Sequence, residues 1–264
     1  MLKAILCLLF ILLWGPKARA LPSATPASES ACRWTQNAQI IFKASHELHQ
    51  IWQFSENPVF WSTLLPASAS LAAFRQAVQT QIPELEPHAY ALMHPPAEDG
   101  EAYNKRLALS SRVAHLEPMN CLEALLLSEQ TARLPMLQAP SEFGAFILRR
   151  RNESGDMRYK VYFSTLDQPG LKMNALVMAQ IESDRQQGWT VWAHLHNHNF
   201  FPEKADPYAS PSPSKTDIEF ARMMKQSLAL ENLWVTNGFH TLHLPQQAFA
   251  LFHGHSDEAQ QTEQ

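Results

Sequence analysis

Three histidines lie at alternate positions in the segment Ala193-His194-Leu195-His196-Asn197-His198. If this segment is a β-strand, alternate side chains project from one face, so two imidazoles can bind the same metal ion. Downstream, Ser214 is suited to cap a helix, which places Asp217 in its first turn, near the loop that follows the histidines. Two histidines and one carboxylate, with a fourth position left to water, are typical of a catalytic zinc site.

These residues resemble the motif of a known family. His-x-His followed by Ser-x-x-Asp, with a glutamate about fifty residues upstream, resembles the motif of the JAMM (JAB1/MPN) zinc metalloproteases. The upstream acid that fits is Glu142, in Pro140-Ser141-Glu142-Phe143-Gly144-Ala145-Phe146-Ile147-Leu148, where it opens an apolar strand. The resemblance covers about residues 120–252.

The third histidine creates two registers for the ligand pair. Trp192-Ala193-His194-Leu195-His196 is similar to the Gly-Trp-x-His lead-in of the eukaryotic members, whereas His196-Asn197-His198 is similar to the RadC-like bacterial branch. We favour His196 and His198 as ligands, with His194 as an alternate ligand or a supporting residue. The chain also departs from the family, since no proline follows His198 and the loop before Ser214 is longer.

The resemblance implies a role for each residue. Zn²⁺ held by His196, His198 and Asp217 would activate a water molecule to cleave the amide of a peptide or isopeptide bond. Glu142 would accept the proton of that water and pass it to the leaving nitrogen. Ser214 would donate a hydrogen bond to the developing oxyanion, although serine is favoured at a helix N-cap for the helix alone. Glu123 is a rival for the base, but it lies in a predicted helix.

Other functions are compatible with the same residues. Three histidines on a strand can be a polar face or an adventitious metal patch, and MPN-like folds also serve as non-catalytic binding or scaffold modules. A metal nuclease of the His-Asn-His type is disfavoured by the acidic net charge, because nucleic-acid affinity depends on clustered lysine and arginine. We therefore expect a peptide or protein substrate and no nucleic acid. The oligomeric state stays open.

The elements expected to position these residues begin near residue 120. We expect helix, two strands, helix, strand, helix and hairpin, at 120–134, 143–150, 158–164, 170–187, 189–197, 214–230 and 233–244. This order predicts an α/β three-layer sandwich around a mixed sheet, and the resemblance implies the cytidine-deaminase-like MPN fold for a domain at 118–256.

The preceding residues are expected to form an all-helical N-terminal extension at 21–117. Helical spacing of apolar residues predicts helices at 35–54, 68–81 and 103–116. Within the first, His46-Glu47-Leu48-His49 resembles a helical zinc-protease motif, but its histidines are three apart rather than four. Solvated residues on a helix face are therefore the preferred interpretation.

Residues 1–20 have the pattern of a secretory signal peptide. Lys3 precedes an uncharged stretch, Gly15-Pro16 breaks it, and Ala18-Arg19-Ala20 supplies a cleavage site after Ala20. The apolar stretch is shorter than the ~18 residues that a membrane span needs, so no stable membrane insertion is expected after cleavage. We expect a periplasmic or secreted protein.

Removal of this leader changes the charge and the cysteine count. The leader carries Lys3, Lys17 and Arg19 and no acid, so its loss shifts the formal net charge from −4 to −7. It also leaves two cysteines, Cys32 and Cys121. In an oxidising compartment such a pair favours a disulfide.

Overall fold

The computed structural model describes residues 31–82, 100–167, 174–200 and 209–254, all within one compact unit. The predicted signal peptide lies outside the described residues, as does the start of the helix expected at 170–187.

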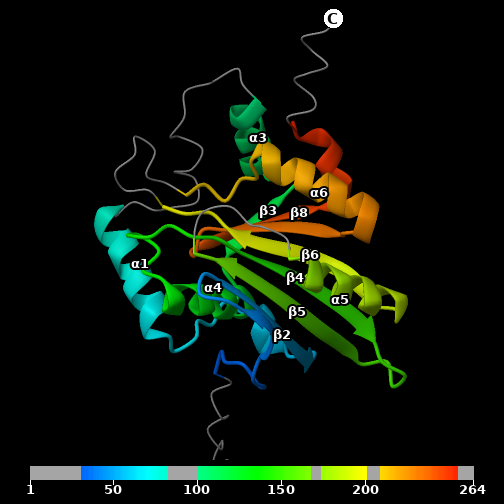
Figure 1. Ribbon diagram of the computed structural model, residues 1–264. Helices are drawn as coiled ribbons and strands as arrows, with labels where there is room; N and C mark the ends of the chain where they lie inside the picture. The colour runs from blue at the N-terminus through cyan, green and yellow to red at the C-terminus, as the bar shows by residue number, and fades with distance from the viewer. Residues whose placement is uncertain (1–30, 83–99, 168–173, 201–208, 255–264) are drawn as a thin grey trace, which may run out of the picture. The chain divides into compact units, whose positions relative to one another are not determined.

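Eight strands form one mixed sheet in the order β1-β2-β5-β4-β6-β7-β8-β3 (Figure 1). In this sheet β6 and β7 pair in parallel and the other neighbours are antiparallel. The bounds of the strands are β1 Gln39–Lys43, β2 Glu47–Ser55, β3 His115–Pro118, β4 Phe143–Arg151, β5 Met157–Leu166, β6 Thr190–Asn197, β7 Asn232–Thr236 and β8 His240–Pro245.

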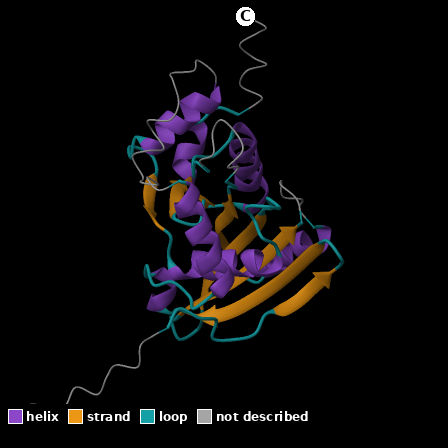
Figure 2. Ribbon diagram, turned by 90° about the vertical axis from the view of Figure 1, so that its left-hand side faces the viewer, coloured by secondary structure: helices purple, strands orange, loops and turns teal. Residues whose placement is uncertain are grey.

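Helices cover both faces of this sheet, and alternation along β4 separates the two cores. Ala145 and Ile147 pack with α4 and α1, whereas Phe146 and Leu148 pack with α5, α6 and α3. In Figure 2, viewed from the side on which α1 lies in Figure 1, the helices lie against the strands. The bounds are α1 Ala69–Gln81, α3 Gly100–Leu109, α4 Cys121–Arg133, α5 Ala175–Gln186 and α6 Lys215–Leu228, with 3-10 turns η1 Pro58–Trp61 and η2 Gln246–Leu251. The predicted α/β sandwich around a mixed sheet is confirmed.

The parallel pair β6 and β7 determines where the functional residues meet. A parallel pair needs a crossover, and α6 supplies it between β6 and β7. The chain leaves β6 at its carboxyl end and enters α6 at its amino end, so these two ends lie at the same edge of the sheet. His198 follows the first end and Asp217 begins the second.

From α4 onward the expected order of elements is confirmed. Asn237-Gly238 connects β7 to β8, as the hairpin pattern predicts. Gly238 has a φ of +87°, and a Cβ there would lie 2.8 Å from the side chains of Leu127 and Phe74. Glycine is therefore needed at this position for both the turn and the packing against α4 and α1.

The helix expected at 35–54 is wrong, because this segment forms β1 and β2. In β2, Trp52 and Phe54 face the α4 side while His49 and Ile51 face the α5 side. Since both faces of β2 carry buried or half-buried residues, the apolar positions imitate helical spacing. The N-terminal region is thus not all helical, because β1, β2 and most of β3 lie in it and extend the central sheet.

The solvated interpretation of His46-Glu47-Leu48-His49 is wrong at His49. His49 is fully buried, and its ring nitrogens contact Ser164 Oγ at 2.8 Å and the carboxylate of Glu47. The helix expected at 103–116 also ends early: α3 stops at Leu109, and residues 115–118 form β3 at the sheet edge. Backbone pairing with β8 makes this short segment a strand.

Cys32 and Cys121 form a disulfide, as expected. It joins the segment before β1 to the first residue of α4, and both half-cystines are buried. A disulfide is consistent with a location outside the reducing cytoplasm. Within the described ranges, no helix has the length and apolar character needed to cross a membrane.

Candidate metal centre

The carboxyl end of β6 positions two histidines on one face. His196 is buried within β6, and His198 is the first residue after the end of this strand. The backbone N–H of His198 donates to Thr236 O at 2.8 Å, which continues the pairing of β6 with β7 for one more residue. The alternation of the strand therefore carries through, and both imidazoles turn towards α6.

The amino end of α6 brings the carboxylate to them. Ser214 is the N-cap and Asp217 the third helical residue of a capping box. Asp217 N–H donates to Ser214 Oγ at 3.1 Å, and Asp217 Oδ2 accepts from Ser214 N at 2.8 Å and Ser214 Oγ at 2.7 Å. These bonds fix the carboxylate at the start of the helix, where the helix dipole favours negative charge.

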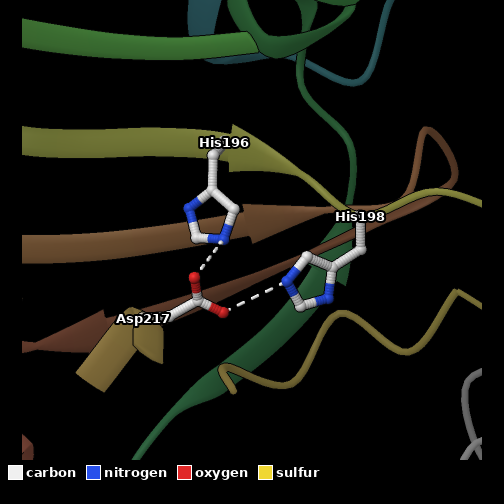
Figure 3. Close-up of side chains that lie close together, drawn as sticks. All are labelled: His196, His198 and Asp217. Atoms are coloured by element: carbon white, nitrogen blue, oxygen red, sulfur yellow. Dashed lines mark hydrogen bonds and ion pairs between the residues drawn. The ribbon is translucent and has the colours of Figure 1, made fainter. Parts of the chain in front are cut away.

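His196, His198 and Asp217 converge from these two elements (Figure 3). Asp217 Oδ1 lies 3.3 Å from His196 Nε2, and Asp217 Oδ2 lies 3.2 Å from His198 Nε2. Nitrogen and oxygen ligands of one tetrahedral zinc ion, each about 2.0–2.1 Å from it, are about 3.4 Å apart. Each imidazole nitrogen thus lies near this distance from one carboxylate oxygen, and one ligand atom from each of the three residues lies within 4.8 Å of the other two, as a single small cation requires.

The ring nitrogens of the two histidines support this interpretation. His198 Nδ1 contacts the backbone carbonyl oxygen of Ser210 at 2.8 Å, which makes Nδ1 the protonated nitrogen and leaves Nε2 to face Asp217. His196 is buried, and within the described residues neither of its ring nitrogens makes a hydrogen bond, although Nε2 lies 3.3 Å from Asp217 Oδ1. A buried nitrogen that faces a carboxylate without hydrogen-bonding to it suits a metal ligand.

The charges of the cluster are mutually dependent. Burial alone would raise the pKa of Asp217, but the adjacent His196 and the hydrogen bond from His198 hold it well below its usual range. Burial alone would likewise lower the pKa of His198, yet its hydrogen bond and ion pair with Asp217 raise it. The raised pKa favours an imidazolium that donates Nε2–H to the ionised carboxylate, so a divalent cation bound here would replace that proton.

Glu142 lies in the same pocket, which has a volume of about 370 Å³. The pocket is lined by Glu142, His194, His196, His198, Ser214, Thr216, Asp217 and Phe220. Glu142 stands immediately before β4 and accepts a hydrogen bond from Asn199 Nδ2 at 3.4 Å. The sheet thus brings the predicted base, from the strand beside β6, to the three candidate ligands.

His194 lies beside this group but not within it. It is 2% exposed, and its ring centroid is 5.7 Å from that of His196. Burial and the nearby His196 lower the pKa of His194 well below its ordinary value, so the imidazole is neutral. The geometry therefore groups His196 with His198, the register favoured from the sequence.

Glu123, the rival for the base, lies on the other side of the sheet. It is fully buried in α4, and its carboxylate accepts hydrogen bonds from Thr241 Oγ1 and His243 Nε2. Its place in a helix was expected, but its burial was not.

Sequence reasoning missed the roles of Asn197 and Phe220. Asn197, between the two histidine ligands, bonds the backbone next to Glu142, and Phe220 lines the pocket. The sequence did contain a signal for Phe220, since a residue three positions after Asp217 lies on the same helix face.

Comparison with protein-family models, curated proteins and solved structures finds no match. The function of this site therefore rests on its own geometry.

Proposed function

We propose that this protein is an exported zinc metallohydrolase that cleaves the amide of a peptide or isopeptide bond. The observation that carries the proposal is the convergence of His196, His198 and Asp217 in one pocket with Glu142. Two imidazoles and one carboxylate suit Zn²⁺, and three protein ligands leave a coordination position for water or substrate. The resemblance to the JAMM motif assigns the same four residues.

When bound, the ion supplies Lewis-acid activation of a water molecule and of the scissile carbonyl. The carboxylate of Glu142 takes the proton of the attacking water and delivers it to the leaving nitrogen. The Ser210 carbonyl and the Ser214 cap keep the imidazole of His198 and the carboxylate of Asp217 in their binding orientations.

Ser214 is proposed to stabilise the oxyanion as well as to cap α6. Its hydroxyl donates to Asp217 Oδ2 in this structure, so the oxyanion role requires the hydroxyl to rotate towards the substrate. The capping bond from Asp217 N–H is accepted by the same oxygen and survives that rotation. Both roles are therefore compatible with one side chain.

Export is supported by the buried Cys32–Cys121 disulfide and by the signal-peptide pattern of residues 1–20. We propose a periplasmic or secreted location, in which the substrate is a peptide or protein of the cell envelope or its surroundings.

Metal analysis together with peptide digestion tests the function. The purified exported protein is expected to carry about one zinc per chain and to cleave members of a peptide mixture, as detected by mass spectrometry. Glu142→Gln should keep the zinc and lose a factor of ~10² to 10⁴ in rate, because an amide cannot take the proton. The exposed Glu153, in the turn between β4 and β5, provides the control Glu153→Gln, which should change neither.

Each failure has a distinct meaning. Absence of zinc would refute the metal site. Zinc without cleavage of any peptide would favour a non-catalytic binding or scaffold module. Normal cleavage by Glu142→Gln would refute the assigned base.

A further inference from the structure

His194 is a buried polar side chain that the proposed chemistry does not use. It lines the same pocket as the candidate ligands and is 2% exposed. Within the described residues, neither Nδ1 nor Nε2 of its ring makes a hydrogen bond. Nearly all buried polar groups in proteins are hydrogen-bonded. An imidazole that borders a pocket and has no hydrogen-bond partner therefore indicates that a polar group of a bound ligand supplies the missing hydrogen bonds.

The position of His194 places this ligand group near the reacting bond. His194 lies two residues before His196 on the same face of β6, about 7 Å along the strand. Phe220 lies about one turn after Asp217 on the same face of α6, and it lines the same pocket. The pocket therefore extends from the metal centre, between β6 and α6, to His194 and Phe220.

Aromatic rings enclose the imidazole at this end. The ring centroid of His194 lies 4.7 Å from that of Phe146 and 4.6 Å from that of Phe220. The charged side chains among the described lining residues are Glu142 and Asp217, both acidic and both beside the histidine ligands. A charged group held between the two phenylalanines would lose its hydration without gaining a counter-ion.

We propose that His194 and Phe220 form a side-chain subsite that recognises an uncharged hydrogen-bonding residue next to the scissile amide. The imidazole offers one N–H donor and one bare nitrogen acceptor, which match a hydroxyl or a carboxamide. The phenylalanine rings contact the apolar part of the same side chain. This subsite rests on the proposed amide hydrolase function, and it defines threonine, serine, asparagine and glutamine as the favoured residues.

Binding of small probes tests the subsite without requiring cleavage. N-acetylthreonine amide and N-acetylvaline amide have nearly the same shape and differ in a hydroxyl, and the asparagine and leucine amides differ in a carboxamide. Titration of the zinc-loaded protein, followed by NMR of the histidine ring nitrogens, should show at least one polar probe binding about tenfold more tightly than its apolar match. Equal binding within both pairs would overturn the inference.

Two variants assign that preference to His194. His194→Phe keeps a ring but removes both nitrogens, so the polar preference should disappear while the zinc content stays that of the wild type. His194→Gln keeps a donor and an acceptor and should retain part of the preference. His115→Phe, at an exposed histidine of β3 outside the pocket, is the matched control and should behave as the wild type. An unchanged preference in His194→Phe would overturn the inference, and so would loss of its zinc, which would make His194 a metal ligand.

Cleavage of a peptide library separates this inference from the proposed function. If the wild type prefers polar residues beside the cut and His194→Phe does not, both stand. If the probes show the preference but no peptide is cleaved, the hydrolase function fails and the subsite stands. If peptides are cleaved with equal rates for the polar and apolar partners, the subsite fails and the function stands.

Discussion

The side chain of Asn197 holds the backbone on both sides of Glu142. Its Oδ1 accepts a hydrogen bond from Phe143 N at 2.8 Å, and its Nδ2 donates to Ser141 O at 3.1 Å. Asn197 is fully buried and lies in sequence between His196 and His198, the two candidate histidine ligands. One side chain thus links the strand that carries the ligands to the segment that carries the proposed base.

We expect Asn197→Ala to lower hydrolysis by about 10- to 100-fold while zinc is retained, because Glu142 loses its fixed position relative to the metal centre. The variant also leaves a buried N–H and a buried carbonyl without a partner, which should lower the free energy of unfolding by about 1–3 kcal/mol. Activity, zinc content and denaturant unfolding measured on the same preparation check these outcomes.

Asn232→Ala provides the control for Asn197→Ala. Asn232 Nδ2 donates to Trp192 O at 2.9 Å, so this variant also removes a bond from an asparagine side chain to the backbone of the sheet, but away from Glu142. It should lose stability without losing activity per folded molecule. Equal activity losses in the two variants would refute the positioning role of Asn197.

His196→Ala should bind zinc more weakly by orders of magnitude. His196 belongs to both possible histidine registers, and removing one of three protein ligands leaves two groups to hold the ion. Elemental analysis after dialysis checks the zinc content, with His115→Ala as a control at an exposed histidine. Wild-type zinc content in His196→Ala would refute the metal site.

The candidate site was more predictable from the sequence than the N-terminal fold. Alternation in β6 and the cap at Ser214 are local signals, and the crossover between parallel strands brings them together. The position of Glu142 before an apolar strand is also local. The contact between Asn197 and the backbone at Glu142 was not predictable, because it depends on the pairing of β4 with β6, which no short segment encodes.

The N-terminal strands were missed for a physical reason. In β2, Leu48, Ile51 and Trp52 have the spacing of one helix face. Because β2 pairs with β1 and β5 as a strand, Leu48 and Trp52 lie on one face of the sheet and Ile51 lies on the other. A strand with both faces covered lacks the simple alternation of apolar and polar residues that identifies a strand in sequence. Tertiary pairing therefore determined the structure of this segment.

The disulfide predicts that neither cysteine can be alkylated without reduction and that the bond raises the free energy of unfolding. Mass spectrometry of the unreduced protein should find Cys32 and Cys121 resistant to alkylation. The bond closes a loop with a sequence separation of 89 residues, and a chain-entropy model gives about 4.6 kcal/mol for a loop of this length. The double variant Cys32→Ser, Cys121→Ser should therefore unfold at a lower denaturant concentration, and two alkylatable thiols in the unreduced protein would contradict the pairing.

Glu123 belongs to a structural hydrogen-bond network that is separate from the candidate metal centre. Its carboxylate caps α4 by accepting from Asn120 N and Asn120 Nδ2, each at 2.9 Å. It also accepts from Thr241 Oγ1 at 2.7 Å and His243 Nε2 at 3.0 Å, so α4 is fastened to β8. Every one of these groups donates, and the central sheet lies between this network and α6.

Glu123→Gln should therefore destabilise the protein and leave the chemistry intact. The carboxamide turns an NH₂ group towards groups that already donate, and the carboxylate that accepts from His243 Nε2 is lost, so the free energy of unfolding should fall by about 2–4 kcal/mol. Glu117→Gln, at an exposed residue of β3, is the control and should change it by less than about 0.5 kcal/mol. Denaturant unfolding measures the stability, and peptide cleavage by the folded fraction measures the rate. If Glu123→Gln is as stable as the wild type but inactive, and Glu142→Gln is active, Glu123 rather than Glu142 is the base.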